Sequence, residues 1–175
     1  VVFYNERPET WRARGGLPNA TGVLLDMDPA NTIELALRLH PRTRKLFVVV
    51  GTSVYDMTWK RRIEPLLAPL EPSHSVTWLD HLPVTKILET VRTLPPDSIV
   101  LYISVMRDAD GKSRTNPQLA AQVAAASVAP VYGFFDTYTG VGIVGGVVAN
   151  FAGQGKAAAQ LALRVLSGER AETIP

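Results

Sequence analysis

The residues of this chain whose types suit ligand binding stand directly after runs of apolar residues. Thr52 and Ser53 follow the run Leu46–Val50 and its exit glycine, and Tyr55 comes just beyond them. Hydroxyl groups and free backbone N–H groups at the start of a helix suit a carboxylate, a phosphate or a sugar oxygen. The alternative is that these hydroxyls only cap the helix that follows.

Two further groups follow later apolar runs: Met106 with Arg107, and Asp136 with Tyr138. The planar guanidinium of Arg107 suits a ligand carboxylate, and an internal ion pair is an equal alternative. Aromatic faces beside a carboxylate and hydroxyls suit a small polar or aromatic molecule. The alternative there is that the aromatic side chains pack in the core and that Asp136 caps a turn.

The elements that must position these groups alternate between strand-like and helix-like patterns. The spacing, about 25 to 30 residues per strand–helix unit, predicts an α/β fold with a Rossmann-like parallel sheet and flanking helices. We expect strands at 1–4, 22–25, 46–50, 75–79, 98–104, 131–135 and 143–148, and helices at 29–40, 55–70, 84–94, 116–128 and 151–166. The polar segment between the first two strands is expected to be a loop. In such a sheet, ligands bind beyond the carboxyl ends of the strands, near the switch in strand order.

The amino-acid composition excludes several kinds of functional site. The 175 residues are 46% hydrophobic and 19% charged, which is typical of a globular chain. The chain has no cysteine, which excludes disulfides, cysteine–zinc sites and iron–sulfur clusters in this segment. The three histidines lack metal-ligand spacing, and the apolar runs are shorter than the roughly 20 residues of a membrane helix. We expect no metal and no cofactor.

Two further sequence patterns could suggest other ligands, but neither indicates one strongly. Gly140, Gly142 and Gly145 spell G-x-G-x-x-G, but they lie inside an expected strand and no helix follows at once, so a dinucleotide site is disfavoured. The basic runs Arg42–Lys45 and Lys60–Arg62 indicate solvated faces, with an anion or nucleic-acid patch as the alternative. We expect no nucleic-acid partner.

The pattern also predicts how the chain is divided. Residues 28–135 are expected to form a complete α/β lobe. Residues 1–27 and 136–175 are expected to be parts of another lobe, and the chain is expected to be a fragment that lacks the N-terminal half of that lobe.

The segments Asn19–Val23, Thr32–Leu37 and Lys45–Val50 resemble the ABC-type substrate-binding proteins of the tryptophan/tyrosine-binding type. Downstream, Ala129–Gly133 and the run from Ala157 through Arg170 agree with that family in order and spacing. The resemblance implies a type I periplasmic-binding-protein fold. It implies two Rossmann-like lobes joined by hinge strands near Asp26–Asp28 and Asp136–Tyr138. The segment "TYTGVGIVGG" looks closer to the extracytoplasmic sensor regions of bacterial histidine kinases.

The resemblance implies a non-catalytic region that binds a small molecule, an amino acid or a small carboxylate, on the extracytoplasmic or periplasmic face of a bacterial membrane. The expected ligand contacts are Thr52, Ser53, Tyr55, Met106, Arg107, Asp136 and Tyr138. The expected parent is a membrane-anchored sensor histidine kinase. The alternatives are a transporter's substrate-binding component, an α/β enzyme that binds a nucleotide cofactor, and an interaction module that has lost its ligand. A homodimer of the fragment through exposed sheet edges is also open.

Overall fold

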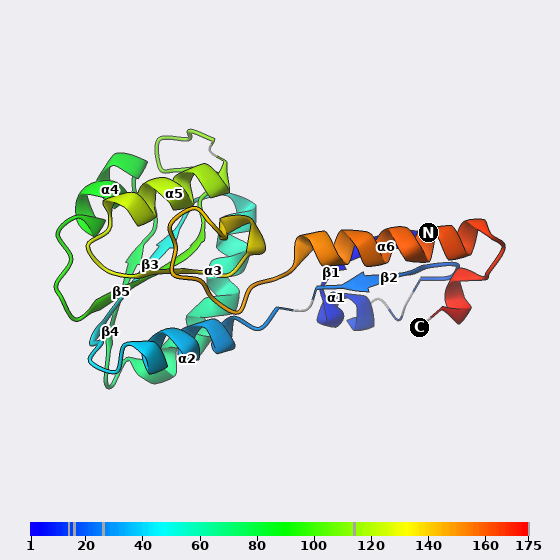
Figure 1. Ribbon diagram of the computed structural model, residues 1–175, viewed down its shortest axis with the longest axis horizontal. Coiled ribbons are helices and arrows are strands. Elements are labelled where there is room, and N and C mark those ends of the chain that lie inside the picture. The colour runs from blue at the N-terminus through cyan, green and yellow to red at the C-terminus, as the bar shows by residue number, and fades with distance from the viewer. Residues whose placement is uncertain (14, 16, 26, 114, 175) are drawn as a thin grey trace. The chain divides into compact units, whose positions relative to one another are not determined.

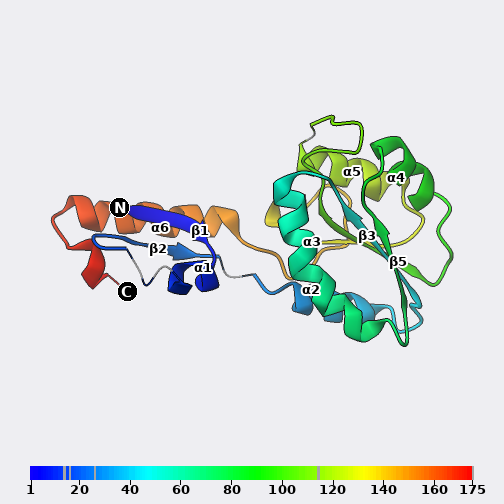
Figure 2. The same cartoon turned by 180° about the vertical axis from the view of Figure 1, so that it is seen from behind.

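The computed structural model describes residues 1–13, 15, 17–25, 27–113 and 115–174. The chain divides into two compact units, of which the smaller comprises Val1–Met27 and Ala149–Pro175 and the larger comprises Asp28–Val148. Figures 1 and 2 show both units from opposite sides, coloured along the chain. The polypeptide therefore passes between the units twice. Asp26, which the sequence suggested as part of a hinge, lies outside the described residues.

The larger unit is a four-stranded parallel sheet in the order β4-β3-β5-β6. Its helices lie in two layers, with α4 and α5 on one face of the sheet and α2 and α3 on the other (Figures 1 and 2). Right-handed crossovers place α3 on one face and α4 and α5 on the other, because the chain steps from β3 outward to β4 and then back across β3 to β5 and on to β6. The strands are β3 (Lys45–Val50), β4 (Ser75–Leu79), β5 (Ser98–Ser104) and β6 (Val131–Gly133), and the helices are α2 (Pro29–Leu39), α3 (Val54–Leu67), α4 (Val84–Val91) and α5 (Asn116–Ala126).

The core of this unit is centred on β5 and β3. Every residue of β5 is buried, and Leu46 and Val48–Val50 of β3 are buried as well. A parallel strand covered by helices on both faces needs apolar side chains on both faces, which explains these continuous apolar runs. The outer strand β4 instead alternates, and its polar residues Ser75 and Thr77 face solvent.

Local sequence signals set the helix boundaries. Asp28 caps α2, accepting a hydrogen bond from the Ala30 N–H at 2.9 Å, and Pro29 occupies the first helical turn. Helix α3 begins after the cap Ser53 and continues into a 3₁₀ turn, η1 (Ala68–Leu70). These boundaries lie within a few residues of those expected from the sequence.

Two sequence expectations are wrong. The segment 143–148 is not a strand: only an isolated parallel bridge joins Gly145 to Tyr132. At Gly146 a Cβ would collide with the carbonyl oxygen of Gly133, so the chain needs glycine at this close approach to β6. The segment expected to be a polar loop near the N-terminus contains a short helix, α1 (Pro8–Ala13).

The smaller unit contains a two-stranded parallel sheet of β1 (Val2–Glu6) and β2 (Thr21–Leu24), and helix α6 (Phe151–Leu166) contacts both strands. The rings of Phe3 and Trp11 lie 4.4 Å apart, which attaches α1 to β1. The Thr21 hydroxyl donates to the carbonyl of Ile174 at 3.2 Å, after a final 3₁₀ turn, η3 (Ala171–Thr173). Residues distant in sequence therefore form one unit.

The larger unit runs past residue 135, where the sequence suggested a boundary, to Val148. Thr32 on α2 explains the difference. Its buried hydroxyl donates to the Val147 carbonyl at 3.0 Å and accepts from the Val147 N–H at 2.9 Å. This pair of hydrogen bonds attaches the segment after β6 to α2.

We expect Thr32→Val to lower the free energy of unfolding by about 1–2 kcal/mol, because two hydrogen bonds of about 1 kcal/mol each are lost. Urea denaturation of the purified chain measures the change. Thr85→Val is the control, because Thr85 is an exposed residue of α4 and its change should stay within about 0.5 kcal/mol. Equal losses in both variants would contradict the assigned role of Thr32.

Candidate functional site

The carboxyl ends of all four parallel strands of the larger unit lie at one edge of the sheet, which we call the carboxyl edge. It comprises Gly51–Asp56 after β3, Leu79–His81 at the end of β4, Ser104–Asp108 at the end of β5 and Phe134–Tyr138 after β6. The strand order reverses between β3 and β5, because β4 was added on one side and β5 on the other. This switch point is where open α/β sheets bind ligands.

The centre of the carboxyl edge is the buried carboxylate of Asp56 in the first turn of α3. Asp56 is fully buried and accepts four donors. The Ser53 N–H donates at 3.0 Å and the Ser104 hydroxyl at 2.5 Å. The Met106 N–H donates to both carboxylate oxygens at 3.1 Å, and the Arg107 N–H donates at 3.4 Å. A buried carboxylate is costly unless it is hydrogen-bonded, so these donors bind α3 to the loop after β5.

Gly51 lets the two loops approach this closely. A Cβ at Gly51 would lie 2.5 Å from an Asp56 carboxylate oxygen and 2.5 Å from the Arg107 carbonyl oxygen. Both distances are far shorter than a van der Waals contact, and the Arg107 oxygen is a backbone atom that cannot easily move away. The position therefore requires glycine because of a close approach rather than a turn.

Thr52 and Ser53, expected as ligand contacts, are engaged by the fold. The Thr52 hydroxyl donates to the Arg107 and Asp108 carbonyls at 3.2 and 3.0 Å, and the Thr52 N–H donates to the Arg107 carbonyl at 2.8 Å. The Ser53 hydroxyl accepts from the Asp56 N–H at 3.1 Å, which completes a reciprocal capping box. Ser53 therefore caps α3, which was the alternative to ligand binding.

Tyr55, Met106 and Arg107 present side chains to solvent at this edge. Tyr55 is 43% exposed and Met106 is 42% exposed. Partial burial raises the pKa of the Tyr55 phenol, so it is a neutral hydrogen-bonding group at physiological pH. The exposed Arg107 guanidinium has no hydrogen bond or ion pair to any residue that the structure describes. Among the described residues, Arg107 therefore has no partner for the internal ion pair that was the alternative to ligand binding.

Asp136 and Tyr138 follow β6 at the carboxyl edge, and the Tyr138 ring belongs to a row of aromatic rings. Asp136 is half-buried and begins a 3₁₀ turn, η2 (Asp136–Tyr138). Tyr138 is 1% exposed and donates its hydroxyl to the Ile103 carbonyl at 3.0 Å, which gives it a place in the core rather than on a binding surface. The ring contacts run from Tyr55 to Trp59 (6.3 Å), Trp59 to Phe135 (5.2 Å), Phe135 to Tyr138 (5.5 Å) and Tyr138 to Tyr102 (5.2 Å).

Sequence reasoning assigned no role to Asp56, the residue on which this edge depends. The signal was present: Ser53 followed three residues later by an acid is the pattern of a capping box. The pattern alone indicates the hydrogen bonds within α3. It carries no information on Ser104, Met106 or Arg107, which reach Asp56 only because β5 lies beside β3.

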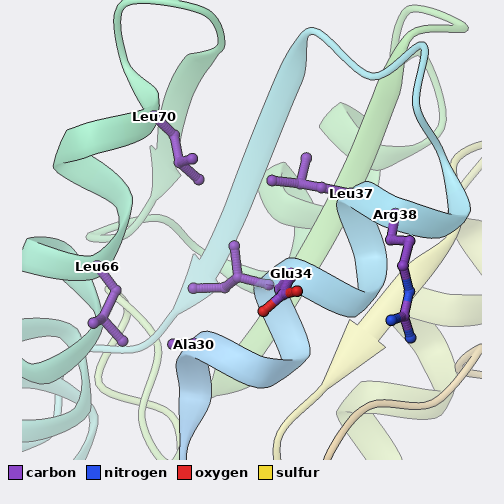
Figure 3. Close-up of a pocket in the computed structure, with 7 residues that line it drawn as sticks. Ala30, Glu34, Leu37, Arg38, Leu66 and Leu70 are labelled. Carbon is purple, nitrogen blue, oxygen red and sulfur yellow. The ribbon is translucent and has the colours of Figure 1, made fainter.

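A hollow lies away from the carboxyl edge, between α2 and the end of α3. It has a volume of about 460 Å³. Figure 3 shows apolar side chains of the two elements facing one another across it, and its lining comprises Ala30, Ile33, Glu34, Leu37, Arg38, Leu66 and Leu70. The Arg38 side chain extends away from Leu66 and Leu70 (Figure 3). Because polar groups do not converge on it, this hollow has the character of loose helix packing rather than of a recognition site.

Within the described residues, no cluster of three His, Asp or Glu side chains could hold a metal ion. No helix in that part of the chain is long and apolar enough to cross a membrane. Comparison with protein-family models, with curated proteins and with solved structures gave no significant match to this chain. The residues themselves therefore carry the functional argument.

We expect Asp56→Asn to lower the free energy of unfolding by about 3 kcal/mol, because buried donors left unpaired cost about 1–3 kcal/mol each. The amide keeps one acceptor oxygen but turns an NH₂ group toward backbone N–H donors. Urea denaturation measures the loss. Asp110→Asn is the matched control, since Asp110 pairs with Lys112 at 3.4 Å on the surface, and its loss should be below about 1 kcal/mol. Similar losses would show that Asp56 does not organise this edge.

The buried tyrosines predict an alkaline pH dependence. Burial raises the pKa of Tyr138 and of Tyr102 far above the usual value of about 10, so the folded chain keeps both protonated where the unfolded chain loses the protons. Stability is therefore full below about pH 10 and falls above it, by about 1.4 kcal/mol per pH unit for each such tyrosine. Tyr138→Phe should reduce this slope, measured by urea denaturation from pH 9 to 11. Tyr4→Phe, at an exposed position, should leave the slope unchanged.

Proposed function

We propose that this chain is a non-catalytic region that binds a small molecule at the carboxyl edge of its larger unit. The observation that carries the proposal is the exposed Arg107 guanidinium, which has no partner among the described residues and whose backbone is held by Asp56 and Thr52 at the switch point of a parallel sheet. Because the backbone is already fixed, ligand binding orders only the side chain of Arg107 and not the loop that carries it.

The surroundings of Arg107 favour a ligand with a carboxylate and an apolar or aromatic body. A guanidinium binds a carboxylate through two parallel hydrogen bonds. The neighbouring exposed side chains are the amphipathic Tyr55 and the adaptable thioether of Met106. An amino acid or a small aromatic or aliphatic acid combines these features.

Binding is favoured over catalysis by the state of two acidic groups at this edge, Asp56 and Asp80. Asp56 is buried and already accepts hydrogen bonds from four donors, and Asp80 pairs with Lys60 at 2.5 Å. Neither is free to exchange a proton with a substrate. The glycine motif at 140–145 lies in a loop with no helix directly after it, which disfavours a dinucleotide cofactor.

The wider proposal is that this region is the extracytoplasmic sensor part of a bacterial histidine kinase with a type I periplasmic-binding-protein fold. Its support is the α/β class with parallel sheets, the passage of the chain between two units after Met27 and after Val148, and the sequence resemblance. In that proposal, ligand binding changes the orientation of the units, and the two crossings take up the rotation. A downstream kinase module in the parent gene supports sensing, whereas a neighbouring permease gene supports uptake.

The test begins with thermal-shift screening of the chain against the twenty common L-amino acids, succinate, benzoate and glucose, followed by calorimetry with each compound that stabilises it. We expect Arg107→Gln to weaken binding of a stabilising carboxylate at least tenfold, since a lost charge-assisted pair is worth about 1.5–3 kcal/mol. Arg92→Gln is the matched control, because Arg92 is an exposed arginine at the far end of α4.

Glucose should bind no more weakly to the Arg107→Gln variant than to the parent chain, because it has no carboxylate. If no carboxylate stabilises the chain, or if Arg107→Gln and Arg92→Gln bind a stabilising acid equally well, the proposal fails.

A further inference from the structure

A second, smaller hollow lies at the amino ends of the strands, at the edge opposite to Arg107. We call it the amino-edge hollow; the loops that enter β3, β5 and β6 line it, and its lining includes His40, Arg42, Thr43, Asp97, Ser98 and Pro130. Its volume is about 170 Å³. Pockets for drug-sized ligands span about 300–1,000 Å³, and one water takes about 30 Å³ in the liquid, so this hollow suits a small ion with a few waters.

Ser98 supplies the first sign of an occupant. The residue is 3% exposed, and its hydroxyl has no hydrogen-bond partner in the part of the chain that the structure describes. Buried polar atoms are almost always paired, because an unpaired one costs about 1–3 kcal/mol. The oxygen itself has almost no accessible surface, but Ser98 lines the hollow, so a polar occupant would satisfy this hydroxyl once the side chain changes rotamer.

The charges around the hollow favour an anion. The exposed guanidinium of Arg42 makes no hydrogen bond or ion pair to a described residue. Arg44 donates to the Thr43 carbonyl at 2.9 Å. Lys45 pairs with Asp97 at 3.1 Å and lowers the pKa of that carboxyl, so the single carboxylate in the hollow already has a counter-charge. Positive charge is therefore in excess.

His40 adds an oriented donor. Its Nε2 lies 2.9 Å from the hydroxyl of the buried Tyr132. When that hydroxyl donates to Nε2, the imidazole carries its proton on Nδ1, which is then a donor for a ligand. An anion in the hollow favours this tautomer.

Asp97 selects among anions. Its Oδ1 accepts from Lys45, and Oδ2 is the acceptor that remains. Inorganic phosphate near neutral pH keeps a P–OH group that can donate to Oδ2, whereas sulfate has no proton and meets only repulsion there. The lining therefore combines donors for a dianion with one acceptor for its hydroxyl.

We propose that the amino-edge hollow is a binding site for inorganic phosphate, held by the Arg42 guanidinium, the His40 Nδ1–H and the Ser98 hydroxyl, with Asp97 accepting from its P–OH. The site is independent of the proposed function, because it lies at the opposite edge of the sheet and shares no residue with it. It also gives a role to the basic run Arg42–Lys45.

The experiment is calorimetric titration of sodium phosphate, and separately of sodium sulfate, into the full chain in a phosphate-free buffer at constant ionic strength. We expect saturable phosphate binding with a dissociation constant below about 1 mM and sulfate binding at least tenfold weaker. Arg42→Gln should weaken phosphate binding about tenfold, since it removes a charge-assisted contact. Arg61→Gln, at an exposed position of α3, should have no effect.

Ser98→Ala separates ligand binding from folding. It should weaken phosphate binding several-fold while leaving the midpoint of thermal unfolding without phosphate unchanged or higher, because an unpaired hydroxyl is removed. The proposal is overturned if phosphate does not saturate, if sulfate binds equally well, or if Ser98→Ala binds phosphate like the parent chain. It is also overturned if Arg107→Gln rather than Arg42→Gln abolishes binding, which would place the anion at the carboxyl edge.

Discussion

The carboxylate of Asp56 is the interaction on which the carboxyl edge of this protein depends. A charge in a buried site is tolerated only when donors surround it, and here the donors come from α3 and from the loop after β5. The network therefore fixes those two segments against each other. Gly51 is the steric condition for the same contact, since a side chain there would push the loops apart. This buried contact fixes the backbone that carries the exposed side chains of Tyr55, Met106 and Arg107.

The parallel sheet explains why polar chemistry is confined to two edges. Both faces of the central strands are covered by helices, and every residue of β5 is buried. Along these central strands, polar groups can meet solvent only where the strands begin or end. A strand of seven residues rises about 3.3 Å per residue, so the two edges are about 20 Å apart. The two proposed sites, for a carboxylate at the carboxyl edge and for phosphate in the amino-edge hollow, are therefore separate within one unit.

A residue type that can bind a ligand can also form hydrogen bonds within the protein or pack in its core. The structure shows which of these each predicted site residue does. Thr52 and Ser53 use their hydroxyls on backbone groups, and Tyr138 is enclosed in the core. Arg107 is different, because its side chain has no partner within the described residues. A sequence pattern gives residue types and spacing, and these are the same for a capping hydroxyl and a ligand-binding one.

The amino-acid sequence by itself determined the α/β class, the caps of α2 and α3 and the runs that become β3 and β5, because hydrophobic periodicity and capping are local properties. Strand order, the donors gathered on Asp56, and the failure of 143–148 to form a strand were decided only by tertiary structure. Each depends on which strand lies beside which, and on close approaches such as Gly146 to Gly133, between residues distant in sequence. The orphaned hydroxyl of Ser98 belongs to the same class, since burial and the absence of a described partner arise only once three loops have converged.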